Sequence, residues 1–153
     1  MNKLESIQKA IEYTQNKDLK NAEKIYLTLL DQNPKDEPIL EVLGLLYMQL
    51  GRLKKAEKTL EKAFGINKSP QIIPHLAKVK TILGKFSESL YLYIELVKKE
   101  KTLENYKELI QAANKCDNNH AIYKFSIEAH EIFPFEPYFL EQASYSAVYV
   151  GQY

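Results

Sequence analysis

Residues 43–60 read LGLLYMQLGRLKKAEKTL, an apolar helical stretch, a turn at Gly51 and a second, amphipathic stretch. A similar arrangement returns around Gly84 and around Gly151, each of which follows an apolar helical stretch. Gly84 follows Gly51 by 33 residues, and Gly151 follows Gly84 by 67, which is one period of 33 plus one of 34. A fixed period of about 34 residues indicates a helical repeat array, because each unit buries its apolar face only against its neighbours.

The composition is that of an ordinary soluble domain, with 45% apolar and 27% charged residues. A net charge of +1 argues against a dedicated nucleic-acid binder, which would carry a basic surplus. The chain shows no signal-peptide core and no run of about 18 apolar residues, so we expect no membrane insertion. Cys116 is the single cysteine, which excludes an intrachain disulfide. Together these features predict a soluble, cytoplasmic protein.

Aligning the chain on its period produces columns of similar residues. The first column of small residues contains Ala10, Gly44 and Ala77, and continues to Ile110 and Ser144. The second, after each turn, contains Ala22, Ala56, Ser89 and Ala121. A bulky column follows four residues later, with Tyr26, Leu60, Tyr93 and Phe125. Antiparallel helices approach closely where both present small side chains, so we expect Gly44 to lie against Ala56. Strand-type alternation does not persist anywhere, which favours an all-α fold.

These columns resemble the tetratricopeptide repeat, and the match is best at Leu43, Gly44, Tyr47, Gly51, Ala56, Leu60 and Ala63. The resemblance covers the whole chain and implies a right-handed helix-turn-helix solenoid of about four and a half repeats in one domain, residues 1–153. The expected repeats span about 3–36, 37–69, 70–102 and 103–135, with a half repeat at 136–153. In the fourth repeat, residues 116–119 replace the glycine turn, and we expect the register to slip there by one residue.

Residues that could carry catalysis are few. His75, His120 and His130 form no recognised metal-ligand spacing with one another, with Cys116 or with a suitable acid. Cys116 and His120 stand four residues apart, which is a weak indication of a nucleophile and its base. We therefore expect no enzymatic activity, no cofactor and no metal within these 153 residues.

In tetratricopeptide arrays the first helices of the repeats line a concave groove that holds a peptide or a partner helix. The resemblance implies that the matching positions here would line such a groove: Ile7, Ile11, Glu41, Leu45, Met48, Lys78, Thr81, Lys107, Gln111, Asn114, Tyr138, Glu141 and Tyr145. We expect Ile7, Ile11, Leu45 and Met48 to accept apolar anchors. The open alternative is that the first helix turns Ile7 and Ile11 inward.

Some family members grip a C-terminal carboxylate through a clamp of Lys, Asn and Arg side chains. The matching positions here hold Ile7, Ile11, Val42, Ile72 and His75, none of which matches the clamp in type. A binder of that kind is therefore not expected.

The resemblance favours a protein-interaction module or scaffold with a protein or peptide partner and no nucleic acid. One alternative is the N-terminal recruiting domain of a longer enzyme, as in bacterial glycosyltransferases, sulfotransferases or methyltransferases with tetratricopeptide front ends. A second is a small secretion chaperone. Residues 147–150 do not resemble a polar cap, which predicts either a longer protein or self-association through this end, with Val148, Tyr149 and Val150 as the pairing residues.

Overall fold

The structure is a computed structural model that describes residues 2–151. Met1, Gln152 and Tyr153 lie outside the described residues, and with them the expected Gln-Tyr ending of the last turn. Within residues 2–151 the chain forms nine α-helices and no strand. Their bounds are α1 Lys3–Gln15, α2 Leu19–Gln32, α3 Glu37–Gln49, α4 Leu53–Asn67, α5 Ile72–Ile82, α6 Phe86–Lys99, α7 Leu103–Lys115, α8 Asn119–Ile132 and α9 Pro137–Val150. The predicted all-α class is confirmed.

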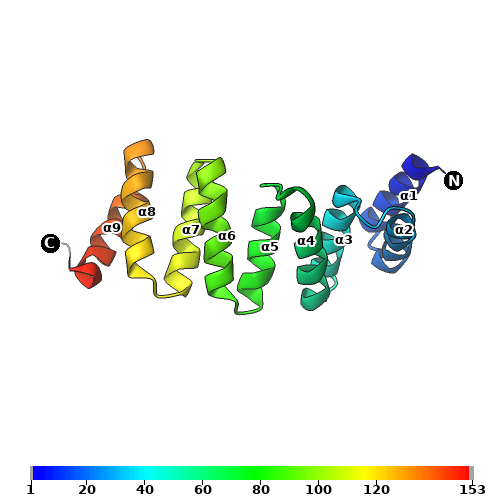
Figure 1. The fold of residues 1–153 in the computed structure, drawn as a ribbon, viewed down its shortest axis with the longest axis horizontal. Helices are drawn as coiled ribbons and strands as arrows, with labels where there is room; N and C mark the ends of the chain where they lie inside the picture. The colour runs from blue at the N-terminus through cyan, green and yellow to red at the C-terminus, as the bar shows by residue number, and fades with distance from the viewer. Residues whose placement is uncertain (1, 152–153) are drawn as a thin grey trace. The chain divides into compact units, whose positions relative to one another are not determined.

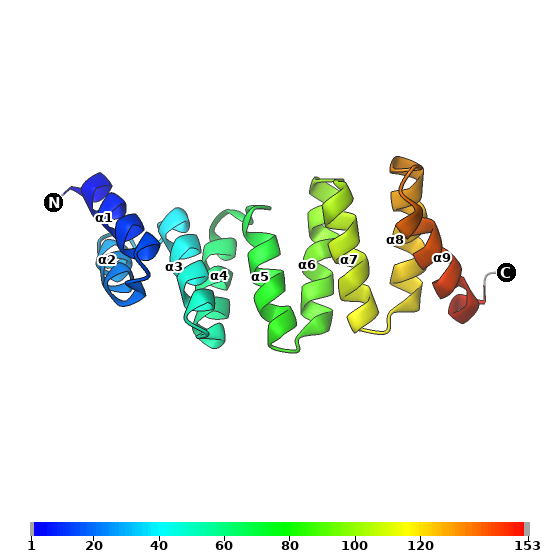
Figure 2. The same ribbon diagram turned by 180° about the vertical axis from the view of Figure 1, so that it is seen from behind.

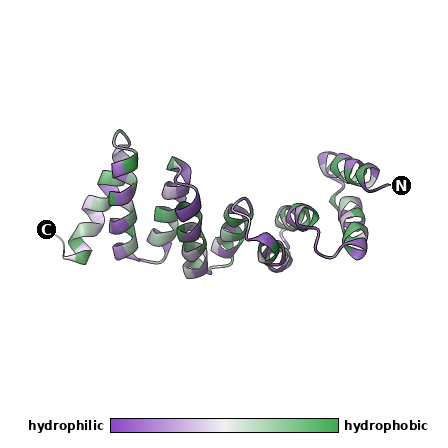
Figure 3. Cartoon of the chain, turned by 45° about the horizontal axis from the view of Figure 1, so that its top comes forward, coloured by the Kyte–Doolittle hydropathy of each residue, from purple (hydrophilic) through white to green (hydrophobic). Residues whose placement is uncertain are grey.

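The chain divides into two compact units, Met1–Val79 and Lys80–Tyr153, with the division inside α5. In the N-terminal unit α1 packs on α2 and α3 on α4, while in the C-terminal unit α6 packs on α7 and α8 on both α7 and α9. Successive helices of each unit run in opposite directions, with connections at alternating ends (Figures 1 and 2). The helices alternate along their turns between hydrophobic and hydrophilic residues, as expected of elements that bury one side (Figure 3).

Five left-handed residues punctuate the chain at the repeat period. They are Lys17, Gly51, Gly84, Asp117 and Gly151, with φ between 53° and 76°. After the first helix of each of the first four repeats, the N–H of this residue donates to the carbonyl three positions back, and the next N–H donates to the carbonyl five positions back. These hydrogen bonds satisfy the carbonyls that the helix end leaves open. The glycine spacing therefore located the turns correctly, and two non-glycine residues occupy the same conformation.

The fourth turn keeps the register of the others, so the predicted slip of one residue is wrong. Asp117 takes the left-handed conformation with φ 53°, and α8 begins two residues later, as α4 does after Gly51. A short polar side chain tolerates this conformation, so no inserted residue is needed. The residues equivalent to Ala56 and Leu60 are therefore Ile122 and Ser126, rather than Ala121 and Phe125.

The closest approach within the second repeat joins α3 and α4 at Gly44. A Cβ built on Gly44 would lie 2.6 Å from Leu60 Cγ, so the glycine receives the bulky leucine rather than Ala56, as the sequence had suggested. Ala56 and Leu60 are both fully buried. The small column of the first helices thus faces the bulky column of the second helices, and this contact fixes how closely each pair packs.

Each unit has its own apolar core. In the N-terminal unit, fully buried large side chains include Tyr26, Leu60, Ile72, Ile73 and Leu76. In the C-terminal unit, the rings of Tyr106, Phe133 and Phe139 lie 6.2–6.3 Å apart, and Tyr106 and Phe139 are fully buried. Among the described residues, every helix is too short or too polar to cross a membrane.

Candidate functional site

The groove positions of the N-terminal unit lie on α1, α3 and the first part of α5. Ile11 is 45% exposed, and Ile7, Leu45 and Met48 are half-buried. On α1 the buried residues are Ser6 and Ala10, so the helix turns these two toward the protein and leaves Ile7 and Ile11 accessible. The alternative in which both isoleucines pack inward is therefore not the arrangement observed.

Polar side chains border this apolar surface on the side of α5. Glu41 Oε1 on α3 lies 3.7 Å from His75 Nε2 on α5, and both side chains are partly exposed. Lys78, further along α5, is exposed. Val42 on α3 is 39% exposed beside Glu41 and adds apolar surface that the groove prediction did not include. The N-terminal unit thus combines apolar positions on α1 and α3 with polar positions on α5.

In the C-terminal unit the groove positions on α7 and α9 are joined by polar contacts. Lys107 Nζ donates to Glu136 Oε2 at 2.9 Å and lies 5.6 Å from the centre of the Tyr138 ring. The hydrogen bond from Lys107, followed by the backbone N–H of Tyr138, holds the pKa of Glu136 below its ordinary value. Burial is the main cause of the raised pKa of Tyr138. A ligand at these residues would meet an already paired cation and a half-buried ring.

Further along α7, Asn114 Nδ2 donates to Gln142 Oε1 of α9 at 3.2 Å. Gln111 and Glu141 are exposed, and the Tyr145 ring is 60% exposed with its centre 5.5 Å from that of Tyr149. Sequence reasoning selected Lys107 and Asn114 but missed their partners Glu136 and Gln142. The separations of 29 and 28 residues could have suggested these pairs, because they bring neighbouring first helices into register.

Thr81 differs from the other predicted groove positions. Its Oγ1 lies 2.8 Å from Ser89 Oγ of α6, and the Thr81 side chain is half-buried. The hydroxyl is therefore engaged between α5 and α6 rather than presented to a ligand.

The clamp positions offer no carboxylate grip. Ile72 is fully buried, so its side chain cannot touch a bound peptide. Ile7, Ile11 and Val42 are aliphatic, and His75 lies near the carboxylate of Glu41. A C-terminal carboxylate at these positions would find apolar side chains in place of the hydrogen-bond donors it needs.

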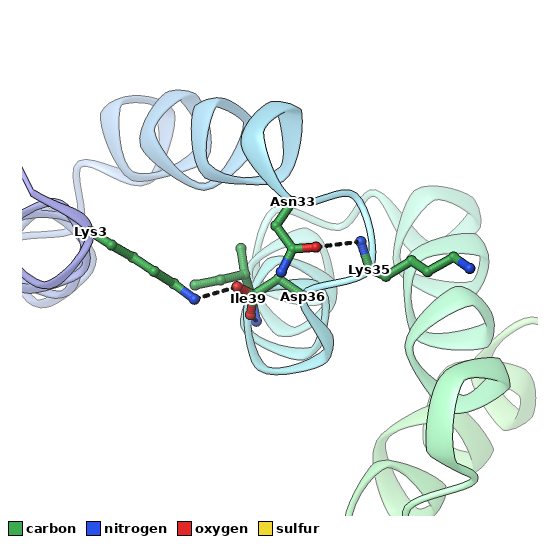
Figure 4. A network of polar contacts seen from close by, with 5 residues as sticks. All are labelled: Lys3, Asn33, Lys35, Asp36 and Ile39. Atoms are coloured by element: carbon green, nitrogen blue, oxygen red, sulfur yellow. Dashed lines mark hydrogen bonds and ion pairs between the residues drawn. The ribbon is translucent and has the colours of Figure 1, made fainter.

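A polar depression of about 550 Å³ lies where the first repeat meets the second. At its edge, Lys3 of α1 reaches Asp36, whose Oδ2 accepts from Lys3 Nζ at 2.5 Å (Figure 4). Oδ1 of Asp36 also accepts from the Ile39 N–H at the start of α3, at 3.4 Å. Asp36 is thus occupied as a helix cap and an ion-pair partner, which makes this region a structural joint between repeats.

A second depression, about 540 Å³, lies over α6 and α8 and is bordered by lysines. Lys98 pairs with Glu95 at 2.6 Å, and Lys101 pairs with Glu128 at 3.0 Å. Glu128 also accepts a 2.6 Å hydrogen bond from the Tyr106 hydroxyl, the largest cause of its lowered pKa. These carboxylates offset the positive charge, so the depression is not a strongly cationic surface.

Comparison with known proteins settles the family. Residues 13–72 match the family model described as the tetratricopeptide repeat. This chain is a tetratricopeptide repeat protein. The predicted resemblance is confirmed, and the fold is an all-α solenoid of these repeats. No curated protein matches the chain by sequence.

Solved tetratricopeptide structures share the fold at low sequence identity. MamA from Desulfovibrio magneticus RS-1 aligns with a TM-score of 0.75 at 12% identity, over 96% of this chain and 84% of that one. YrrB, described as a TPR protein with an unusual peptide-binding site, aligns with a TM-score of 0.74 at 17% identity, over 96% and 77%. The first TPR of Spaghetti (RPAP3), bound to the HSP90 peptide SRMEEVD, aligns with a TM-score of 0.66 at 18% identity, over 74% and 94%.

Proposed function

We propose that this tetratricopeptide chain is a protein-interaction module that holds a peptide or helix of a partner protein against the first helices of its N-terminal unit. The observation that carries the proposal is the accessibility of apolar side chains on α1 and α3: Ile7, Ile11, Val42, Leu45 and Met48 are exposed or half-buried. Apolar side chains at helical spacing are suited to receiving the anchors of an extended or helical segment. Two proteins of similar fold are described with a peptide or a peptide-binding site, which supports the same type of role.

The chemistry of the surface restricts the partner. Aliphatic residues and a methionine favour apolar anchors, and methionine adapts to anchors of different shapes. Glu41, His75 and Lys78 at the edge would contact polar groups beside those anchors. Because the clamp positions carry no suitable donors, the partner would bind through an internal segment rather than through its C-terminal carboxylate. The proposal assigns the binding to the cytoplasm, where a single cysteine would remain reduced.

The test begins with the purified chain and a displayed library of random peptides. Peptides that are selected are synthesised, and their affinities are measured by fluorescence anisotropy against the wild type and the double variant Leu45→Asp, Met48→Asp. The matched control is Leu27→Asp on α2, because Leu27 is apolar and 42% exposed but lies on a second helix.

The proposal predicts that the double variant weakens binding at least tenfold, because a carboxylate in an apolar contact is left desolvated, while Leu27→Asp binds as the wild type does. Circular dichroism of each variant verifies that its helices are retained. A folded double variant that binds the selected peptides normally, or a library that produces no binder, would show that this surface is not the binding site.

A further inference from the structure

Two rows of positions on the first helix of each repeat face the second helix of the same repeat. Counted back from the left-handed turn residue, they stand 11 and 7 positions before it. In the first four repeats these positions are buried, with exposures of 8% or less at Ser6, Ala10, Leu40, Ile73, Ala77, Tyr106 and Ile110, and with Gly44 against Leu60. Burial of both rows is therefore the normal state of a first helix in this chain.

On α9 the same two rows are exposed. Leu140 stands 11 positions before Gly151 and is 50% exposed, and Ser144 stands 7 positions before it and is also exposed. Val148 continues this row and is 57% exposed. The opposite side of α9 is well packed, since Phe139, Ala143 and Ser146 are buried and α9 contacts α8 extensively. A firmly anchored helix thus presents the surface that elsewhere receives another helix.

We propose that this exposed row of α9 pairs with the same row of a second copy of the chain, in an antiparallel arrangement with Ser144 near the two-fold axis. Leu140, Ser144 and Val148 follow one another at intervals of four residues, with the small residue in the centre. A two-fold axis at Ser144 then places Leu140 opposite Val148 of the second copy, and such self-complementarity is the requirement for a symmetric dimer.

The polar chemistry of α9 favours this occupant. Glu141 is the only charged residue of α9, and it does not belong to the row, so two copies would bring no like charges together in the contact. The Ser144 hydroxyl donates to the Leu140 carbonyl at 2.8 Å within its own helix. Its burial would therefore leave no donor without an acceptor, and the usual cost of covering a polar group is avoided.

The test uses crosslinking of the full chain. In a Cys116→Ala background, Ser144→Cys brings two thiols together at the proposed axis, and mild oxidation is expected to produce a disulfide-linked dimer. Glu141→Cys in the same background is the matched control, because it lies on the same helix outside the row. Multi-angle light scattering without oxidation measures the mass of the wild type across the micromolar range, with Leu140→Glu as the disrupting variant.

The proposal predicts a mass that rises toward twice the 17.8 kDa of one chain with increasing concentration, and a shift of Leu140→Glu toward the single-chain mass. It also predicts crosslinking at Ser144→Cys at least tenfold faster than at Glu141→Cys. A monomer at every concentration would overturn it, and the row would then serve a different helix. Equal crosslinking at both positions would also overturn it, since random collision would explain the bond.

Discussion

The second and fourth repeats place their large and small side chains on opposite helices of the pair. In the second repeat the first helix contributes Gly44 and the second helix contributes Leu60, whose Cγ would lie 2.6 Å from a Cβ on the glycine. At the equivalent positions of the fourth repeat, Ile110 is on the first helix and Ser126 on the second, and both are fully buried. The comparison teaches that the packing requires a certain combined volume at this position rather than a particular residue on each helix.

The two repeats also differ one helical turn from this contact. The fourth repeat carries Tyr106 and Glu128, joined by a 2.6 Å hydrogen bond, where the second carries Leu40 and Lys62. Burial raises the pKa of Tyr106, and its hydrogen bond to Glu128 raises it further. The fourth repeat thus replaces part of the apolar contact by a polar one, and the Oγ of Ser126 is buried without a hydrogen-bond partner in the structure. These differences explain why its sequence looks degenerate while its helices keep the common register.

The largest effect is expected from Ile110→Ala. If Ile110 supplies the volume that Leu60 supplies in the second repeat, its truncation leaves a cavity next to a serine that cannot fill it. Ile→Ala at a fully buried site costs about 2–5 kcal/mol. Urea unfolding followed by circular dichroism measures the loss, with Gln111→Ala on the exposed side of α7 as control. A loss for Ile110→Ala equal to that of the control would refute the exchange of volumes.

A smaller but more specific effect is expected from Gly44→Ile, which introduces the residue of the fourth repeat into the second. Overpacking against Leu60 should cost about 1–3 kcal/mol. Adding Leu60→Ser creates the combination found in the fourth repeat. The double variant should be more stable than the sum of the two single changes predicts, by about 1 kcal/mol or more, as a double-mutant cycle measures. Strict additivity would mean that the two positions do not share one volume.

The smallest effect concerns the turns, where the second repeat has Gly51 and the fourth has Asp117, both left-handed. Gly51→Ala should destabilise the chain by about 1 kcal/mol, because a Cβ disfavours this conformation. No atom lies within 4 Å of a Cβ built there, so the effect would come from the backbone alone. Asp117→Gly should stabilise the chain by roughly 0.5–1 kcal/mol for the same reason. Thermal unfolding of both variants measures the signs, and equal signs would contradict this account.

Much of the fold was predictable because it follows from local chemistry. Glycine spacing located the turns at 51, 84 and 151, and apolar residues at helical spacing indicated the helices between them. The fourth turn was harder, since no glycine marks it. An aspartate can take the left-handed conformation but does not require it, so the sequence left room for a shift that the structure does not contain.

The candidate site was predictable in part. Accessible apolar side chains at Ile7, Ile11, Leu45 and Met48 agree with the groove hypothesis, which remains a proposal. The engagement of Thr81 by Ser89, and of Lys107 by Glu136, was not readable from the sequence. These contacts depend on how neighbouring helices are rotated and spaced, which the repeat period alone does not specify.

The sequence by itself determined the helical class, the period and the positions of most turns, because these depend on the spacing of apolar residues and on the conformational freedom of glycine. The tertiary structure alone decided that Gly44 receives Leu60, that Ile122 and Ser126 continue the columns of the fourth repeat, and that Leu140 and Ser144 of α9 are exposed. The physical reason is that a contact between two helices depends on the combined volume and orientation of side chains from both, so neither helix carries the information alone.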